Sequence, residues 1–256
     1  MARRRVAGVH AAESAVEHSP ERIVTAWIDP RRRDPRLAAI AQKLEALGVW
    51  VQSAAQQRLD ELAEGGRHQG VVLELAASGE RSEQDLQEAL GSPGEWPLFL
   101  VLDQVQDPHN LGACLRTAAA AGAQGVVVTR DRSVGLTSTV ARVASGAAEI
   151  VPVYRVVNLA RVLRWFRDSG LWVVGTAAEA EQSLYAADLT GPLAIVVGAE
   201  GKGLRRLTRD SCDLLVKIPL AGGVESLNLS VAAGIVLFEA VRQRGARRAQ
   251  GRAVAG

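Results

Sequence analysis

The sequence predicts an α/β protein in which a mostly parallel sheet, covered by helices on both faces, follows a smaller α/β domain. From residue 97 onward, short apolar runs alternate with segments of helical periodicity. Most of these runs are continuously apolar, which is typical of strands buried on both faces. A segment rich in Ser, Gly and Glu, residues 76–96, separates this pattern from an earlier and shorter alternation.

Residues 1–75 are expected to form the smaller domain, and residues 76–96 a linker with one short helix. Apolar periodicity and turn residues define the elements of the smaller domain. The expected helices cover residues 9–17, 34–47 and 56–63, and the expected strands cover residues 22–28, 49–52 and 70–75.

Residues 97–244 are expected to form the larger domain, and the basic tail 245–256 is expected to be disordered. The expected strands of the larger domain are residues 98–102, 125–129, 150–154, 171–175, 193–197 and 214–218. Its expected helices are residues 110–121, 136–145, 159–168, 180–187, 204–211 and 227–244. In open parallel sheets the ligand lies beyond the carboxyl ends of the strands, so the loops there are the candidate site.

Composition and residue spacing limit the classes of protein to which this chain can belong. The chain has 256 residues, 48% of them hydrophobic and 23% charged, with a formal net charge of +2. Arginine carries most of the positive charge in clusters, which suits RNA phosphate and is equally consistent with a solvated basic surface. Cys114 and Cys212 have no CxxC spacing, so neither a disulfide framework nor a zinc site is predicted. With no apolar leader and no run of about 18 apolar residues, the protein is expected in the cytoplasm.

The first unusual loop leads into the predicted helix 110–121. Asn110 is expected to cap that helix, and Arg116 lies six residues later among apolar residues. Since an unpaired buried arginine is costly, Arg116 is expected to meet an anion, either a carboxylate or an RNA phosphate.

Two further loops follow later strands. Residues 198–204 place Glu200 among three glycines, with a spacing that fits neither common phosphate loop, so a neutral or cationic ligand is favoured over a phosphate. A tight glycine turn with an exposed Glu200 is the alternative. Residues 218–233 offer Ser226 and Asn228 where a helix begins, and a plain N-cap role for Ser226 remains open.

Three motifs in these loops resemble those of the SpoU (TrmH) family of RNA ribose 2′-O-methyltransferases, in order and in spacing. They are residues 107–116, 198–201 and 218–232. Residues 6–11, 59–62 and 68–70 are similar to the N-terminal RNA-binding domain of a subgroup that methylates guanosine. The resemblance implies a SPOUT fold with a trefoil knot, an N-terminal domain like ribosomal protein L30e, a homodimer, and S-adenosyl-L-methionine as cofactor. Separately, His10, His68 and His109 have no shared metal spacing, so no metal is expected.

The resemblance also implies residue roles. The catalytic set it implies is Asn110, Arg116, Glu200, Ser226 and Asn228. The cofactor-binding set it implies is Thr176, Gly198, Gly201, Ile218, Leu220 and Leu227. Because a guanidinium keeps its proton at neutral pH, Arg116 is better suited to hold the phosphate beside the target ribose than to act as a base.

The substrate expected from the resemblance is a guanosine of large-subunit (23S) ribosomal RNA, either free or in an assembling particle. One alternative is the same chemistry on tRNA or on an rRNA adenosine, as in the thiostrepton-resistance branch of the family. Another is a non-catalytic RNA-binding protein that assists ribosome assembly.

Overall fold

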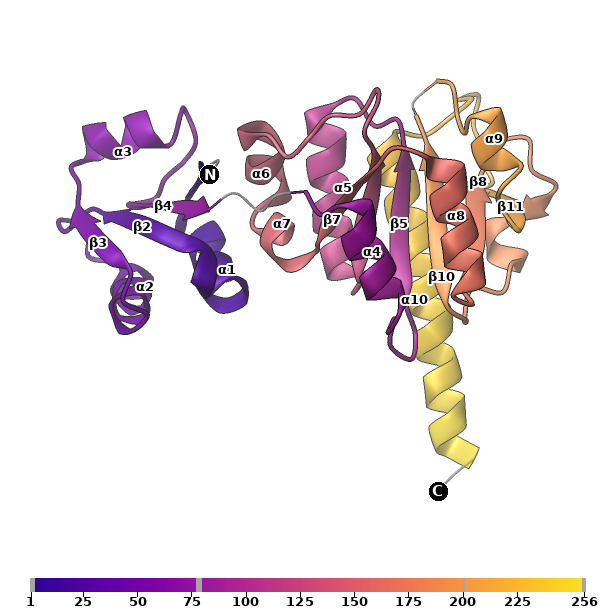
Figure 1. Cartoon of the computed structure of the whole chain (residues 1–256), viewed down its shortest axis with the longest axis horizontal. Coiled ribbons are helices and arrows are strands. Elements are labelled where there is room, and N and C mark those ends of the chain that lie inside the picture. Colours follow the sequence, from indigo (N-terminus) through magenta and orange to yellow (C-terminus); the bar gives the residue numbers. More distant parts are fainter. Residues whose placement is uncertain (1–2, 77–79, 200, 255–256) are drawn as a thin grey trace. The chain divides into compact units, whose positions relative to one another are not determined.

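The computed structural model describes residues 3–76, 80–199 and 201–254. The chain divides into two compact units (Figure 1). The N-terminal unit consists of Met1–Gly79 together with Leu136–Ile150, and the C-terminal unit of Glu80–Gly135 together with Val151–Gly256.

A four-stranded mixed sheet forms the centre of the N-terminal unit, in the order β1-β4-β2-β3. Strand β4 pairs antiparallel with β1 and with β2, while β2 and β3 run parallel. The strands are β1 (Arg3–Ala7), β2 (Ile23–Ile28), β3 (Trp50–Ser53) and β4 (Val71–Ala76). Sequence analysis missed β1, because three consecutive arginines give no apolar pattern and the strand depends on its pairing with β4.

Five helices and one 3₁₀ turn complete the N-terminal unit, and a cluster of buried aliphatic side chains from α1, α2 and three strands forms its core. They are α1 (Val9–His18), η1 (Pro20–Arg22), α2 (Pro35–Ala46), α3 (Gln56–Leu62), α6 (Ser138–Ala144) and α7 (Ala147–Ile150). Helices α6 and α7 thus join this unit although the adjacent strands in sequence belong to the other one.

A seven-stranded sheet, parallel throughout, forms the centre of the C-terminal unit in the order β7-β6-β5-β10-β8-β11-β9. The strands are β5 (Leu98–Asp103), β6 (Gly125–Thr129), β7 (Val153–Val156), β8 (Trp172–Thr176), β9 (Gln182–Ser183), β10 (Leu193–Gly198) and β11 (Leu214–Lys217). The predicted α/β class is confirmed. The trefoil knot stays a prediction.

Helices cover both faces of this sheet. Figure 1 shows α4 and α8 on one face and α5 and α10 on the other. Their bounds, with those of α9 and a 3₁₀ turn, are α4 (Glu83–Leu90), α5 (Pro108–Ala120), α8 (Leu159–Asp168), η2 (Leu184–Ala186), α9 (Arg206–Arg209) and α10 (Leu229–Val254). Buried side chains of α4 and α8 pack on β5, β7 and β10 in one apolar cluster.

Three expected elements differ in the structure. Residue 150 ends helix α7, so the strand expected over 150–154 begins only at Val153. The helix expected over 180–187 is instead the short strand β9 followed by a 3₁₀ turn. Residues 245–254, expected to be disordered, continue helix α10, which suits their content of alanine, arginine and glutamine.

The Arg244 side chain binds α10 to the backbone at the amino ends of two central strands. Its guanidinium donates to the backbone carbonyls of Trp96 (3.2 Å), Pro97 (3.0 Å) and Gly191 (2.5 Å). Burial lowers the pKa of this guanidinium. These carbonyls precede β5 and β10, so one side chain fixes the helix against the amino ends of both strands.

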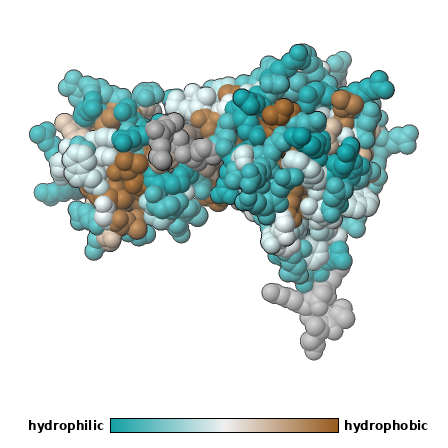
Figure 2. Space-filling view, in the orientation of Figure 1, coloured by the Kyte–Doolittle hydropathy of each residue, from teal (hydrophilic) through white to brown (hydrophobic). Residues whose placement is uncertain are grey.

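Hydrophilic side chains cover most of the molecular face shown in Figure 2, where apolar areas are of limited extent. Within the described ranges, every helix is too short or too polar to cross a bilayer.

Candidate active site

The carboxyl ends of β8, β10 and β11 open onto a cavity of about 350 Å³, here called the cofactor cavity. These strands are neighbours in a parallel sheet, so their carboxyl ends meet at one edge. All six residues that the resemblance assigned to the cofactor line this cavity. They are Thr176, Gly198, Gly201, Ile218, Leu220 and Leu227.

The loop after β10 forms one wall of the cofactor cavity and depends on glycine. A Cβ on Gly198 would lie 2.1 Å from the carbonyl carbon of Gly203, so no other residue fits there. Gly201 and Gly203 have φ values of 71° and 63°, in the left-handed region that favours glycine. Glu200, the carboxylate expected at the centre of this loop, lies outside the described residues.

A buried carboxylate that sequence analysis did not single out anchors this loop. The Asp103 side chain, fully buried at the end of β5, accepts hydrogen bonds from Arg205 Nε (2.8 Å), Arg205 N (3.2 Å) and Thr208 Oγ1 (2.7 Å). An acidic residue closing an otherwise apolar strand was the available signal, since such a group is buried only with partners.

A second cavity of about 320 Å³, here called the acceptor cavity, shares Ala199, Lys202 and Leu229 with the cofactor cavity. Asn110 and Arg132 also line it. The two cavities are therefore adjacent, and a group held in one lies beside a group held in the other.

Asn110 is not the helix cap that the sequence suggested. Asp107 caps α5 by accepting from His109 N at 2.8 Å, and Pro108 occupies the first helical position, where a missing N–H costs nothing. Asn110 lies inside the first turn, buried, and its Oδ1 accepts from Asn228 Nδ2 at 2.9 Å. This bond joins the first and third motifs across 118 residues of sequence.

Asn228, rather than Ser226, caps the last helix. Its Oδ1 accepts from Ser230 N (2.9 Å), Ser230 Oγ (2.7 Å) and Val231 N (3.3 Å). The plain N-cap role considered for Ser226 is therefore filled by another residue. Ser226 is exposed and lines the cofactor cavity.

Arg116 is exposed on α5 and lines neither cavity, contrary to the premise that its helix buries it. Asn110 and Arg116 are six residues apart, so their side chains project about 120° apart around the helix. Within the described part of the chain, the Arg116 side chain makes no hydrogen bond or ion pair. The structure therefore brings together Asn110, Asn228 and the cavities, but not Arg116.

Neither cysteine is suited to act as a nucleophile. Burial raises the pKa of both thiols to about 12, which leaves them protonated at neutral pH. Among the described residues, no three His, Cys, Asp or Glu side chains are grouped so that they could hold a metal ion.

Two family models together match most of the chain. Residues 97–238 match the SpoU rRNA Methylase family, and residues 5–80 match the model for RNA 2′-O ribose methyltransferase substrate binding. A relative from Shewanella oneidensis, named 23S rRNA (guanosine-2′-O-)-methyltransferase RlmB, is 54% identical over 93% of this chain and 96% of its own length. The protein of that name from Pseudomonas putida is 52% identical over 95% and 98%.

Solved structures agree with these matches. The SpoU methyltransferase AviRb from Streptomyces viridochromogenes, in complex with the cofactor AdoMet, superposes with a TM-score of 0.79 at 27% identity, covering 95% of this chain and 91% of that one. An AdoMet-bound rRNA methyltransferase from Sinorhizobium meliloti gives 0.78 at 28% identity, with 94% and 87% covered. By these matches, this chain belongs to the SpoU rRNA Methylase family.

Proposed function

We propose that this chain transfers the methyl group of S-adenosyl-L-methionine to the 2′-hydroxyl of a guanosine ribose in 23S rRNA. The observation that carries the proposal is the adjacency of two cavities at the carboxyl edge of the parallel sheet, one containing all six expected cofactor residues. The names of relatives more than half identical to this chain support the substrate, and the AdoMet-bound family structures support the cofactor.

The cofactor cavity suits a nucleoside joined to an amino acid. Ile218, Leu220 and Leu227 provide apolar surface for an adenine ring, and the glycine loop lets backbone groups approach closely. Lys202 and Glu225 also line the cavity and offer opposite charges to a carboxylate and an ammonium group.

When bound, S-adenosyl-L-methionine supplies an electrophilic methyl group on a positively charged sulfur. The chain has to hold a ribose oxygen in line with that methyl group, at about 3–3.5 Å. Asn110 lines the acceptor cavity and is fixed by Asn228, so it is suited to orient the ribose. Ser226 lines the cofactor cavity and can donate a hydrogen bond to the same sugar or to the cofactor. Glu200 remains a member of the proposed catalytic set.

A second copy of the chain is proposed to cover an apolar face of α10. Val231, Phe238 and Val241 are 50%, 47% and 36% exposed, and their spacing places them on one side of the helix. Helix α5 packs along α10, where a Cβ on Gly234 would lie 3.5 Å from Thr117 Cγ2. A twofold axis beside these helices would bury the apolar residues of both copies.

The same dimer would give Arg116 a role. Arg116 precedes Thr117 on α5, is exposed, and lines neither cavity of its own chain. At the proposed interface it would reach the acceptor cavity of the second copy and hold the phosphate next to the target ribose. Lysine would keep the charge but lose the two parallel hydrogen bonds that a guanidinium makes with phosphate. With ribosomal RNA as its substrate, the enzyme is proposed to act in the cytoplasm.

The test is transfer of labelled methyl from S-adenosyl-L-methionine to unmodified 23S rRNA, with the product mapped as an alkali-resistant ribose and the Arg116→Ala variant run alongside. A single 2′-O-methylguanosine that disappears in the variant is the expected result. Transfer to tRNA or to an adenosine instead would overturn the substrate. Cofactor binding without transfer to free RNA or to ribosomal precursor particles would favour a non-catalytic assembly role.

A further inference from the structure

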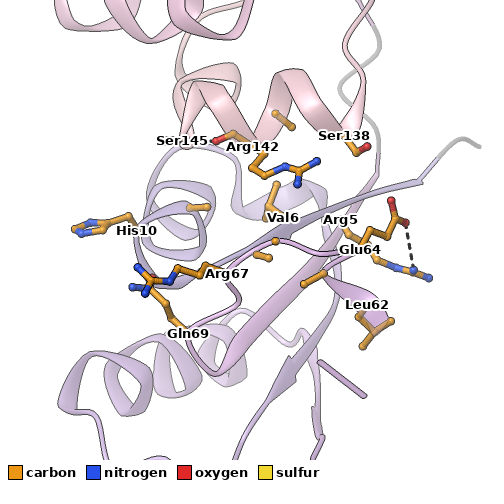
Figure 3. Close-up of a pocket in the computed structure, with 16 residues that line it drawn as sticks. Arg5, Val6, His10, Leu62, Glu64, Arg67, Gln69, Ser138, Arg142 and Ser145 are labelled. Carbon is orange, nitrogen blue, oxygen red and sulfur yellow. Dashed lines mark hydrogen bonds and ion pairs between the residues drawn. The ribbon is translucent and has the colours of Figure 1, made fainter. Parts of the chain in front are cut away.

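The N-terminal unit contains a cavity of about 330 Å³ that plays no part in the site described above. Its walls come from β1, α1, the turn between α3 and β4, and helix α6 (Figure 3). We call it the basic pocket and define it by six lining residues, Arg5, His10, Arg67, Gln69, Ser138 and Arg142. Helix α6 lies outside the residues 5–80 that match the substrate-binding family model.

Among the described residues, two arginines of the basic pocket have no carboxylate partner. Arg5 lies 3.9 Å from Glu64 and 3.8 Å from Glu74, so its charge is compensated. Among the described residues, neither Arg67 nor Arg142 makes an ion pair or a side-chain hydrogen bond. The pocket therefore carries excess positive charge from two different parts of the sequence.

His10 contributes little to this excess. Its Nδ1 lies 3.1 Å from Arg36 Nη2 and 3.7 Å from Glu13 Oε2. Arg36 in turn forms two hydrogen bonds with the Glu13 carboxylate, which lowers the pKa of Glu13. This group is already balanced, so Arg67 and Arg142 are the cations available to a ligand.

The wall that carries Arg67 has a fixed backbone. Gly8 has a φ of 101°, and a Cβ there would lie 3.1 Å from the Arg67 carbonyl oxygen and 3.2 Å from Gln69 Oε1. Gln69 Oε1 accepts from Val9 N at 3.2 Å, which ties the turn to the start of α1. Preorganised walls lower the entropy cost of binding a ligand.

The wall that carries Arg142 is also held in place. Ser14 Oγ donates to the Gly146 carbonyl at 3.3 Å, and a Cβ on Gly146 would lie 2.9 Å from Ser14 Cβ. Arg22 Nη1 forms a 3.0 Å ion pair with Glu149, whose side chain is 1% exposed. These contacts join the segment containing α6 to α1 and its following turn within one unit. In Figure 3 the Arg142 guanidinium extends from α6 toward β1.

We propose that the basic pocket binds the phosphodiester backbone of the substrate RNA. Arg67 and Arg142, whose guanidinium groups extend to different sides of the pocket in Figure 3, would each contact a different phosphate. The proposal rests on the proposed function and extends RNA contact to α6. Guanidinium groups bind phosphate oxygens bidentately, and a pocket of this size admits a phosphate with part of its ribose. Ser138 and Gln69 can hydrogen-bond to sugar hydroxyls beside it.

The experiment measures binding of the full chain to transcribed, unmodified 23S rRNA over a range of salt concentrations, for Arg67→Gln and Arg142→Gln. Each neutralised phosphate contributes roughly 0.7–0.9 to the slope of log affinity against log salt. Each variant should therefore lose that much slope and bind about five- to eightfold more weakly at 0.1 M salt. The Arg164→Gln variant removes another exposed arginine, on α8, that has no side-chain partner among the described residues, and should bind like wild type.

Unchanged affinity and slope in both variants would overturn the proposal. A loss confined to ribosomal particles, with free RNA bound normally, would also overturn it and would indicate a protein partner. If the glutamine variants fold poorly, Ser138→Glu introduces a carboxylate at the first position of α6, where helices tolerate one, and should weaken binding similarly. Methyl transfer by the wild type is scored separately, so its absence would count against the proposed function and leave the test of the pocket intact.

Discussion

Replacing Asp103 with asparagine tests how the cofactor loop is held. The wild-type carboxylate is fully buried and accepts three hydrogen bonds from Arg205 and Thr208. An asparagine of the same shape keeps one oxygen, but its amide group presents hydrogen atoms to a donor. One hydrogen bond to a charged group, worth about 1.5–3 kcal/mol, is lost. Because the Arg205 side chain is 47% exposed and regains water, we expect a loss near the lower end, about 2 kcal/mol.

Urea unfolding measures this loss as a lower midpoint at unchanged slope. The dissociation constant of S-adenosyl-L-methionine should also rise, because binding then has to order the loop between Gly198 and Arg205. The rise is limited by the stability lost, so about 2 kcal/mol allows at most roughly a 30-fold change. Asp131→Asn, which changes an exposed acid, should alter the free energy of unfolding by less than about 0.5 kcal/mol. An Asp103→Asn protein with wild-type midpoint and cofactor affinity would show that the carboxylate does not hold this loop.

Three further outcomes are expected. Arg244→Lys should lower the free energy of unfolding by about 2 kcal/mol in urea melts, because lysine cannot reach three carbonyls, whereas Arg164→Lys should change little. The Arg116→Ala and Ser226→Ala variants, each inactive alone, test whether Arg116 acts in the partner's site. If it does, mixing the two should restore about one quarter of wild-type methyl transfer, since half of the dimers are then mixed and each of these contains one intact site. No recovery would place Arg116 in its own chain's site. Both cysteines, with thiol pKa values raised to about 12, should resist maleimide at pH 8 in the folded protein and react in urea, and rapid labelling of the native protein would contradict these raised pKa values.

The parts of the fold that the sequence predicted are those with strong local patterns. Helix α8 was predicted with its observed bounds, because its apolar residues repeat with helical spacing and Asn158 caps it by accepting from Arg161 N. The central strands were predicted because continuous apolar runs leave few alternatives. Strand β1 and the placement of α6 in the N-terminal unit depend on partners distant in sequence, which no local pattern records.

The residues of the candidate site were likewise predicted only in part. Motif spacing selected six residues that line one cavity, since each motif follows a strand of the same sheet. Helical phase was harder to judge for Arg116, because the alanines around it suit a buried and an exposed face equally well. Asp103 was missed because an acid at a strand end is also common in exposed turns, and only the contacts with Arg205 and Thr208 distinguish the two cases.

The positions of the expected cofactor residues and of Arg116 give a reason for the proposed dimer. The cofactor cavity contains its expected residues within one chain, whereas the arginine expected to hold the RNA phosphate is exposed on α5, beside helix α10 with its exposed apolar side chains. If the acceptor cavity of one chain were complete without a second copy, burying the apolar face of α10 would affect stability but not methyl transfer. A Phe238→Glu variant that becomes monomeric should therefore keep S-adenosyl-L-methionine binding and lose methyl transfer, as followed by sedimentation, calorimetry and labelled-methyl assay. An active monomer would show that the apolar face and the active site are independent.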